Sequence, residues 1–161
     1  MLAEKKSIAF LAKFFAIFGA GELLLPVIPL DWLEQSIAGL EAKMLGIKAT
    51  GNIVSVQNYE FLINEYCTGA VSSLILFALV FSLKKPGIKT KAGMWAVGTS
   101  VLFIANIGRV YAVLWSAANI SPGIAESVHI ASWFLVSGII IALWYYLTKN
   151  IAKVENFREL L

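Results

Sequence analysis

The stretch Asn-Glu-Tyr-Cys-Thr-Gly at residues 64–69 leads directly into the apolar run Ala-Val-Ser-Ser-Leu-Ile-Leu-Phe-Ala-Leu-Val-Phe-Ser-Leu at residues 70–83. The stretch contains Cys67, the only cysteine of the chain, and the run that follows is typical of a membrane helix. Two ionisable residues, Arg109 and His129, lie inside later apolar runs. A lone cysteine with a distant histidine is a candidate nucleophile–base pair, and ionisable residues within membrane helices are usually functional.

Composition assigns the protein to the integral membrane class. Hydrophobic residues make up 59% of the 161 residues, which is too high a share for a soluble protein and fits one membrane domain over residues 1–161. A single cysteine excludes an intrachain disulfide. The net charge of +3 comes from lysines and arginines in short loops, so it indicates topology, and we expect no nucleic-acid partner. No metal-ligand spacing and no phosphate-binding loop occurs, so we expect no metal and no cofactor.

Four apolar runs predict an all-α integral membrane fold with four transmembrane helices. Their approximate limits are residues 7–28, 68–83, 92–114 and 124–147. The first run follows lysines, as a cleaved signal peptide would. However, it has no Ala-x-Ala-like cleavage site and the chain begins at Met1, so we expect this run to stay as a span.

The polar region at residues 31–66 predicts a small insertion between the first two spans. Asp31 and Glu34 resemble a capping box, and Gly46 is a plausible helix stop. Between them, an apolar stripe at helical spacing predicts a short amphipathic helix lying on the membrane surface; the stripe comprises Leu33, Ile37, Leu40 and Met44.

After this helix the apolar period changes to two. Residues Ile53–Val56 and Tyr59–Ile63 predict short strands, with turns at Gly51-Asn52 and Gln57-Asn58. We expect the last strand to run directly into Cys67. Strands outside a helical membrane domain are unusual, and an exposed strand edge there could pair with an extended peptide.

The distribution of basic residues predicts the orientation. Four spans place both termini on one side, together with nine basic residues: Lys5, Lys6, Lys84, Lys85, Lys89, Lys91, Lys149, Lys153 and Arg158. The opposite side holds only Lys43 and Lys48. The positive-inside rule therefore predicts cytoplasmic termini and an extracytoplasmic insertion.

Helix geometry predicts that the three unusual residues share one depth. At about 1.5 Å per residue, Cys67 lies roughly 24 Å, Arg109 roughly 26 Å and His129 roughly 27 Å above the cytoplasmic boundary. The hydrocarbon core is about 30 Å thick, so all three are expected just beneath the extracytoplasmic face.

Each residue also has a structural interpretation. Cys67 alone would more often be a small apolar packing residue, and His129 an interfacial residue. Arg109 requires a partner, and an ion pair would be structural; the available carboxylates are Glu22, Glu65 and Glu126. Asn106 lies three residues before Arg109 and so shares its helix face. Aromatic belts at the membrane interfaces account for Trp32, Trp115 and Trp133.

The order Cys67-Thr68-Gly69, then Asn106-Ile-Gly-Arg109, then His129 resembles the exosortase/archaeosortase family, and the compact chain is similar to small archaeal members. The resemblance implies a membrane-embedded cysteine transpeptidase with Cys67, Arg109 and His129 as catalytic residues. Its expected partners are exported proteins with a C-terminal tripartite sorting signal, and a membrane lipid is one expected acceptor. The residues expected to bind substrate or support the site are Tyr66, Thr68, Gly69, Asn106 and Glu126.

A mechanism follows as a hypothesis. Cys67 in the first turn of a helix would be activated by the helix dipole and by His129 as base. Arg109, with the backbone N–H groups of Thr68 and Gly69, would stabilise the oxyanion, and Asn106 would orient His129 or the substrate. An acceptor amine, a lipid headgroup or water would resolve the thioester, and the sequence does not separate transfer from plain proteolysis.

A second function class remains open at this point. The chain could be a non-catalytic four-helix scaffold or a small transporter, with Arg109 as an ion-pair or substrate-charge residue and Cys67 inert. The discriminating feature is the reactivity of the Cys67 thiol: a transporter would tolerate its loss and an enzyme would not.

Overall fold

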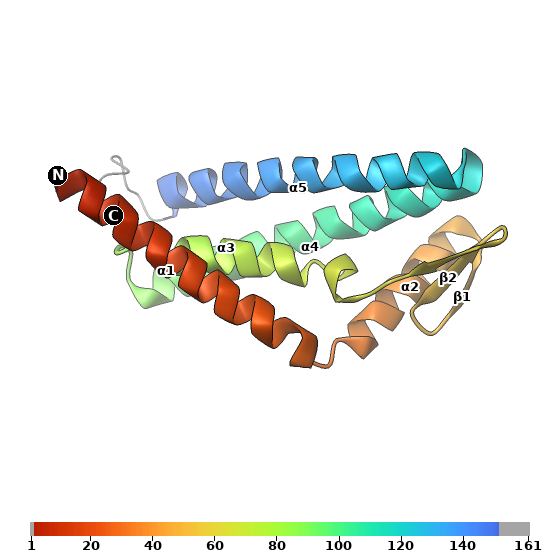
Figure 1. Ribbon diagram of the computed structural model, residues 1–161, viewed down its shortest axis with the longest axis horizontal. Coiled ribbons are helices and arrows are strands. Elements are labelled where there is room, and N and C mark those ends of the chain that lie inside the picture. The colour runs from red at the N-terminus through yellow and green to blue at the C-terminus, as the bar shows by residue number, and fades with distance from the viewer. Residues whose placement is uncertain (1, 152–161) are drawn as a thin grey trace.

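The computed structural model describes residues 2–151 as a helical membrane protein with a small sheet (Figure 1). Its elements in chain order are α1 (Leu2–Leu24), the 3₁₀ turn η1 (Leu25–Val27), α2 (Asp31–Leu45), β1 (Lys48–Thr50), β2 (Ile53–Val56), β3 (Tyr59–Leu62), the 3₁₀ turn η2 (Glu65–Cys67), α3 (Ala70–Ser82), α4 (Ile88–Asn119) and α5 (Pro122–Asn150).

Within residues 2–151, three stretches are helical, long and apolar enough to cross a membrane: Lys6–Val27, Ile88–Asn119 and Pro122–Asn150. These correspond to the first, third and fourth predicted spans. The predicted second span at residues 68–83 is not confirmed as a membrane-crossing helix. The helix α3 has 13 residues, which at 1.5 Å per residue is about 20 Å against a core of about 30 Å. It begins late because residues 64–69 are used for a separate turn.

The membrane helices pack around α3. Figure 1 shows α4 and α5 side by side along the long axis, with α3 beside α4 and α1 crossing diagonally, and α1 makes its main helix contact with α3. Gly98 of α4 allows a close approach, since a Cβ there would lie 2.3 Å from Leu76 and 3.1 Å from Leu147. The core at this level consists of Leu76, Val80, Met94, Leu102, Val136, Ile140 and Leu147.

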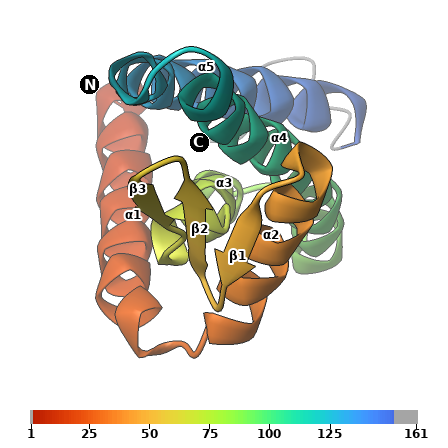
Figure 2. The ribbon, with the colours of Figure 1, turned by 90° about the vertical axis from the view of Figure 1, so that its right-hand side faces the viewer.

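A second unit, which we call the sheet module, comprises α2 and the sheet β1-β2-β3 (Figure 2). Both hairpins are antiparallel, and their turns place Gly51 and Gln57 at positive φ. The predicted strand Ile53–Val56 is confirmed, β3 ends one residue earlier than predicted, and the short strand β1 was not predicted. The module packs on the last turns of α4 through Val110, Val113, Leu114 and Ala117.

The bounds of α2 are close to the prediction, because Gly46 ends the helix in the left-handed conformation. The predicted capping box is wrong: Leu30 is the N-cap, and Asp31 already lies inside the helix. Of the predicted apolar stripe, Ile37 is buried within the protein, at 2% exposure. Leu40 and Met44, by contrast, are 44% and 53% exposed.

The buried face of α2 is therefore rotated relative to the predicted stripe. The buried face consists of the apolar residues Ile37, Ala38 and Ala42 together with two acidic residues, Glu34 and Glu41. Tertiary contacts determine this choice, because the face packs on the sheet and Glu34 accepts a hydrogen bond from Asn52 Nδ2 at 3.0 Å. Of the basic residues used to predict topology, Lys153 and Arg158 lie outside the described residues.

Glu41 provides a stability test of this packing. Its carboxylate is fully buried and has no hydrogen-bond partner among residues 2–151, and burial raises the pKa of Glu41 from 4.5 to about 7. Between pH 4.5 and about 7 the Glu41 carboxyl is therefore protonated in the folded protein and ionised in the unfolded chain. Stability due to this group therefore falls as pH rises through that window.

We predict that Glu41→Gln stabilises the protein at pH 8 by about 1–3 kcal/mol, because the amide has no charge to bury and so removes the cost that the raised pKa of Glu41 represents. The gain should shrink as pH falls to 5, where the native carboxyl is protonated. Thermal unfolding of both proteins in detergent across this range measures the effect. A pH slope that is the same in both proteins would contradict it.

Candidate active site

Cys67 is positioned by a turn of its own between β3 and α3. Its N–H donates to the Asn64 carbonyl at 2.8 Å. Thr68 closes the turn, because its Oγ1 donates to the Glu65 carbonyl at 2.6 Å and accepts from Ala70 N at 3.2 Å. The predictions that the strand runs directly into Cys67, and that Cys67 lies in the first turn of a helix, are therefore wrong. α3 begins three residues later.

Gly69 forms the joint between this turn and α3. Its φ of +84° lies in the left-handed region, and a Cβ at this position would lie 3.3 Å from Asn106 Cβ. A side chain here would meet both backbone strain and a close neighbour. The chain therefore requires glycine at the point where it turns from Cys67 into α3.

Asn106 connects α4 to the Cys67 turn. Its Nδ2 donates to the Cys67 carbonyl at 2.6 Å, and its Oδ1 accepts from Arg109 Nε at 3.1 Å. Arg109 Nη2 also donates to the Tyr66 carbonyl at 3.1 Å. The amide therefore orients the cysteine backbone and the guanidinium. The prediction that it orients His129 is not what the contacts show.

Arg109 is 7% exposed and has no carboxylate partner in the described part of the chain. The expected ion pair with Glu22, Glu65 or Glu126 is therefore absent, since neutral oxygens hold Nε and Nη2. The remaining nitrogen, Nη1, is buried without a hydrogen-bond partner among the described residues. The guanidinium carbon lies 4.9 Å from the centre of the Trp133 ring, a cation–π contact.

Trp133 also fixes the ring of His129. Its Nε1 donates to His129 Nε2 at 3.0 Å. An indole nitrogen can only donate, so Nε2 is the acceptor and the neutral imidazole carries its proton on Nδ1. The interfacial role assigned to Trp133 from the sequence is therefore incomplete. The sequence did contain a sign of this contact, because Trp133 follows His129 by four residues and therefore lies on the same helix face.

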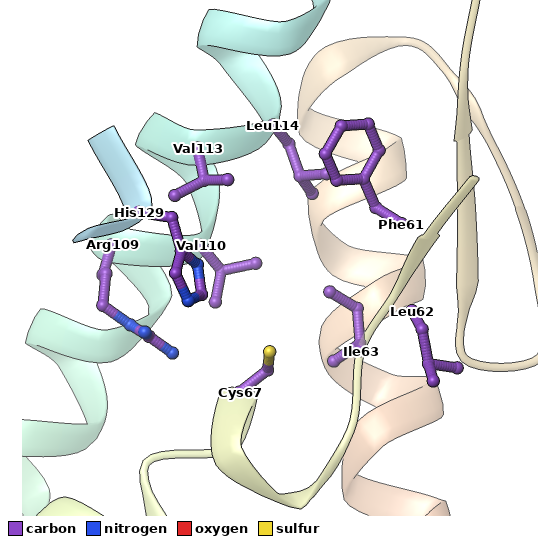
Figure 3. A pocket seen from close by; sticks show the side chains of 9 residues that line it. All are labelled: Phe61, Leu62, Ile63, Cys67, Arg109, Val110, Val113, Leu114 and His129. Atoms are coloured by element: carbon purple, nitrogen blue, oxygen red, sulfur yellow. The ribbon is translucent and has the colours of Figure 1, made fainter. Parts of the chain in front are cut away.

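Cys67, Arg109 and His129 line one cavity of about 150 Å³, which we call the thiol cavity. Figure 3 shows the three side chains directed toward the same space from η2, α4 and α5. The other lining residues are apolar: Phe61, Leu62, Ile63, Val110, Val113 and Leu114. The structure thus brings together the three residues that helix rise places at one depth.

The expected supporting residues occupy different places. Asn106 and Thr68 are buried behind the thiol cavity, and Tyr66 contributes its carbonyl while its side chain is 42% exposed. The Thr68 N–H is taken by the Glu65 carbonyl at 3.3 Å, so it is not free for an oxyanion. Glu126 lies outside the thiol cavity and lines a neighbouring one with His129. No group of three metal-ligating side chains occurs among the described residues.

Comparison with protein-family models gives a match to the transmembrane exosortase family over residues 5–146. The chain belongs to the transmembrane exosortase family. The comparisons with curated proteins and with solved structures gave no significant match. Exosortases are membrane transpeptidases of protein sorting, and the apolar helices of this exosortase-family chain agree with a membrane location.

Gly69→Ala tests the joint that positions the thiol in this exosortase. We predict a loss of about 1–3 kcal/mol of stability from the left-handed backbone, together with displacement of Asn106 and slower alkylation of Cys67. Thermal unfolding and iodoacetamide labelling in detergent measure the two effects. Gly108→Ala is the matched control, because a Cβ added at this α4 glycine would have nothing within 4 Å, and the change should be neutral or stabilising. Equal behaviour of the two variants would contradict the assignment.

Proposed function

We propose that this protein is a membrane-embedded cysteine transpeptidase that cleaves the C-terminal sorting signal of exported surface proteins through a thioester on Cys67. The observation that carries the proposal is the convergence of a thiol, an imidazole and a guanidinium on the thiol cavity. Arg109 Nη1 is buried there without a hydrogen-bond partner among the described residues. Family membership supports the same reaction class.

The first step is attack of the Cys67 sulfur on the scissile carbonyl carbon. The thiol proton passes to His129, and the sulfur forms a bond to carbon. In the resting structure the lone pair of His129 Nε2 accepts from Trp133. Substrate entry must therefore turn the ring away from Trp133 before Nε2 takes the proton.

Arg109 stabilises the negative charge that develops on the carbonyl oxygen. Its Nε and Nη2 are occupied by Asn106 and the Tyr66 carbonyl, so the fork is held in place with Nη1 free to donate. A buried, pre-oriented donor needs no reorganisation during the reaction, which is how such groups lower the barrier.

Collapse of the tetrahedral intermediate breaks the C–N bond. The leaving amine takes the proton from His129, and the upstream part of the substrate remains on Cys67 as a thioester. An acceptor amine, a membrane lipid headgroup or water then attacks this thioester and regenerates the thiol. The substrates are exported proteins with a tripartite sorting signal, and the reaction requires no cofactor.

We propose cytoplasmic termini and a thiol cavity near the extracytoplasmic face. Basic residues support this orientation. The start of α1, the connection between α3 and α4, and the end of α5 all lie at the end of the molecule opposite the sheet module (Figure 1). These segments carry Lys6, Lys84, Lys85, Lys89 and Lys149. The substrate's tail helix would then lie in the bilayer with its scissile bond at the level of Cys67.

Processing of a co-expressed exported protein with a sorting signal tests the proposal. We predict that Cys67→Ala abolishes cleavage, and that Arg109→Lys slows it by about a hundredfold or more, the usual effect of losing an oxyanion donor. Ser127→Ala, an exposed change on the same helix as His129, should leave cleavage unchanged.

Amounts of each variant in the membrane fraction serve as the control for insertion. A scaffold or transporter would tolerate Cys67→Ala and fail only on Arg109→Ala. Normal processing by an inserted Cys67→Ala protein would therefore exclude the transpeptidase.

A further inference from the structure

The sheet module has a free edge that leads to Cys67. β3 is the last strand in the order β1-β2-β3. The Ile63 N–H donates to the Asn52 carbonyl at 2.8 Å, and backbone groups alternate in direction along a strand. Tyr59 and Phe61 therefore also bond toward β2, whereas the N–H and C=O groups of Glu60 and Leu62 point away from it. No described residue hydrogen-bonds these outward groups.

Two cavities lie along this edge. Phe61, Leu62 and Ile63 line the thiol cavity. Tyr59, Glu60 and Phe61 line a neighbouring cavity of about 330 Å³ that also reaches Glu126, which we call the glutamate cavity. The side chains of successive strand residues point to opposite faces of a sheet. All five residues 59–63 nevertheless line one or the other of the two cavities. The cavities therefore follow the edge of β3 and not one face of the sheet.

The two cavities adjoin each other along β3. They share Phe61, Val113 and His129, and the thiol cavity ends at Cys67. At about 3.3 Å per residue, residues 59–63 extend over about 13 Å, which matches four residues of an extended peptide. A peptide laid along these two cavities would therefore end at the reacting atom of the proposed function.

The lining defines the chemistry of the occupant. Val110, Val113 and Leu114 form an apolar wall next to the thiol, whereas the far end carries the exposed carboxylates of Glu60 and Glu126. This gradient suits a peptide with small apolar side chains near the scissile bond and a basic residue about four positions before it.

We propose that the substrate segment upstream of the scissile bond binds as a fourth strand on the free edge of β3, exchanging backbone hydrogen bonds with Glu60 and Leu62. The inference rests on the proposed function, because it assigns a substrate-binding mode to the same site. Backbone pairing supplies affinity and places the scissile carbonyl beside Cys67, while the two cavities select side chains.

The first test uses the wild-type chain in detergent and an N-acetylated tetrapeptide of alternating Val and Ala that ends in a vinyl sulfone. The Cys67 thiol adds across the double bond of the vinyl sulfone and becomes alkylated. The tetrapeptide should alkylate Cys67 faster than the corresponding single-residue vinyl sulfone. Methylating one peptide nitrogen at a time should slow alkylation by about fivefold or more at alternate positions, the effect of losing one hydrogen bond, with little effect between them. A uniform response along the peptide, or none, overturns the proposal.

The second test changes the strand. Leu62→Pro removes an outward N–H without removing a bond to β2, which an edge strand tolerates. Ala49→Pro is the matched control: Ala49 lies between Lys48 and Thr50 on the other edge strand, and the same alternation directs its N–H away from β2. Leu62→Pro should abolish the advantage of the tetrapeptide, and Ala49→Pro should keep it. Equal effects of the two variants overturn the proposal.

Iodoacetamide separates this inference from the proposed function. A thiol that reacts with iodoacetamide but gains nothing from the tetrapeptide overturns strand addition alone. A thiol inert to both reagents overturns the proposed function and the inference with it. If Leu62→Pro converts a dimer to a monomer in detergent, the edge pairs with a second copy of the chain and the proposal is also overturned.

Discussion

The hydrogen bond from Asn106 Nδ2 to the Cys67 carbonyl is the constraint on which the site depends. It joins a residue in the middle of α4 to a turn 39 positions earlier in the chain. The same amide accepts from Arg109 Nε through its other end. One side chain therefore sets the position of the cysteine backbone relative to the guanidinium. Removing either of these two hydrogen bonds would leave a buried polar group unpaired, which costs more free energy than the bond itself contributes.

The long helix α4 carries this constraint from the membrane helices to the sheet module. Before Asn106 it packs on α3 and α5, with Met94 and Leu102 in the core of the membrane helices. After Arg109 it packs on α2 and the sheet through Val110 and Leu114. The thiol cavity lies against the second of these cores, because Ile63, Val110 and Leu114 belong to both. Its residues come from elements that only the complete fold brings together.

Helix rise predicted from the sequence that three distant residues lie at one level, because the rise per residue is nearly constant. Counting residues from the helix ends placed Cys67, Arg109 and His129 in one layer, and the structure brings them to one cavity. The limits of α2 and the strand Ile53–Val56 were also close, since Gly46 and the turn residues act locally. These features depend on short-range geometry.

Long-range contacts account for what the sequence did not predict. The buried face of α2 is chosen by the sheet, so Glu41 is buried while Met44 is exposed. A buried arginine led us to expect a carboxylate partner, but an amide oxygen and a backbone carbonyl oxygen hold it instead. Gly69 adopts a positive φ that ends the turn before α3, and nothing in the apolar pattern marks that boundary.

The most direct test of the central claim is intact-mass measurement of the purified chain after incubation with a sorting-signal substrate, without an added acceptor amine. We predict an adduct equal to the upstream substrate fragment on Cys67. Hydroxylamine should release it, as expected of a thioester, and it should form more slowly in His129→Ala. Cleavage of the substrate without any adduct on Cys67, or an adduct that also forms in Cys67→Ala, would contradict the account.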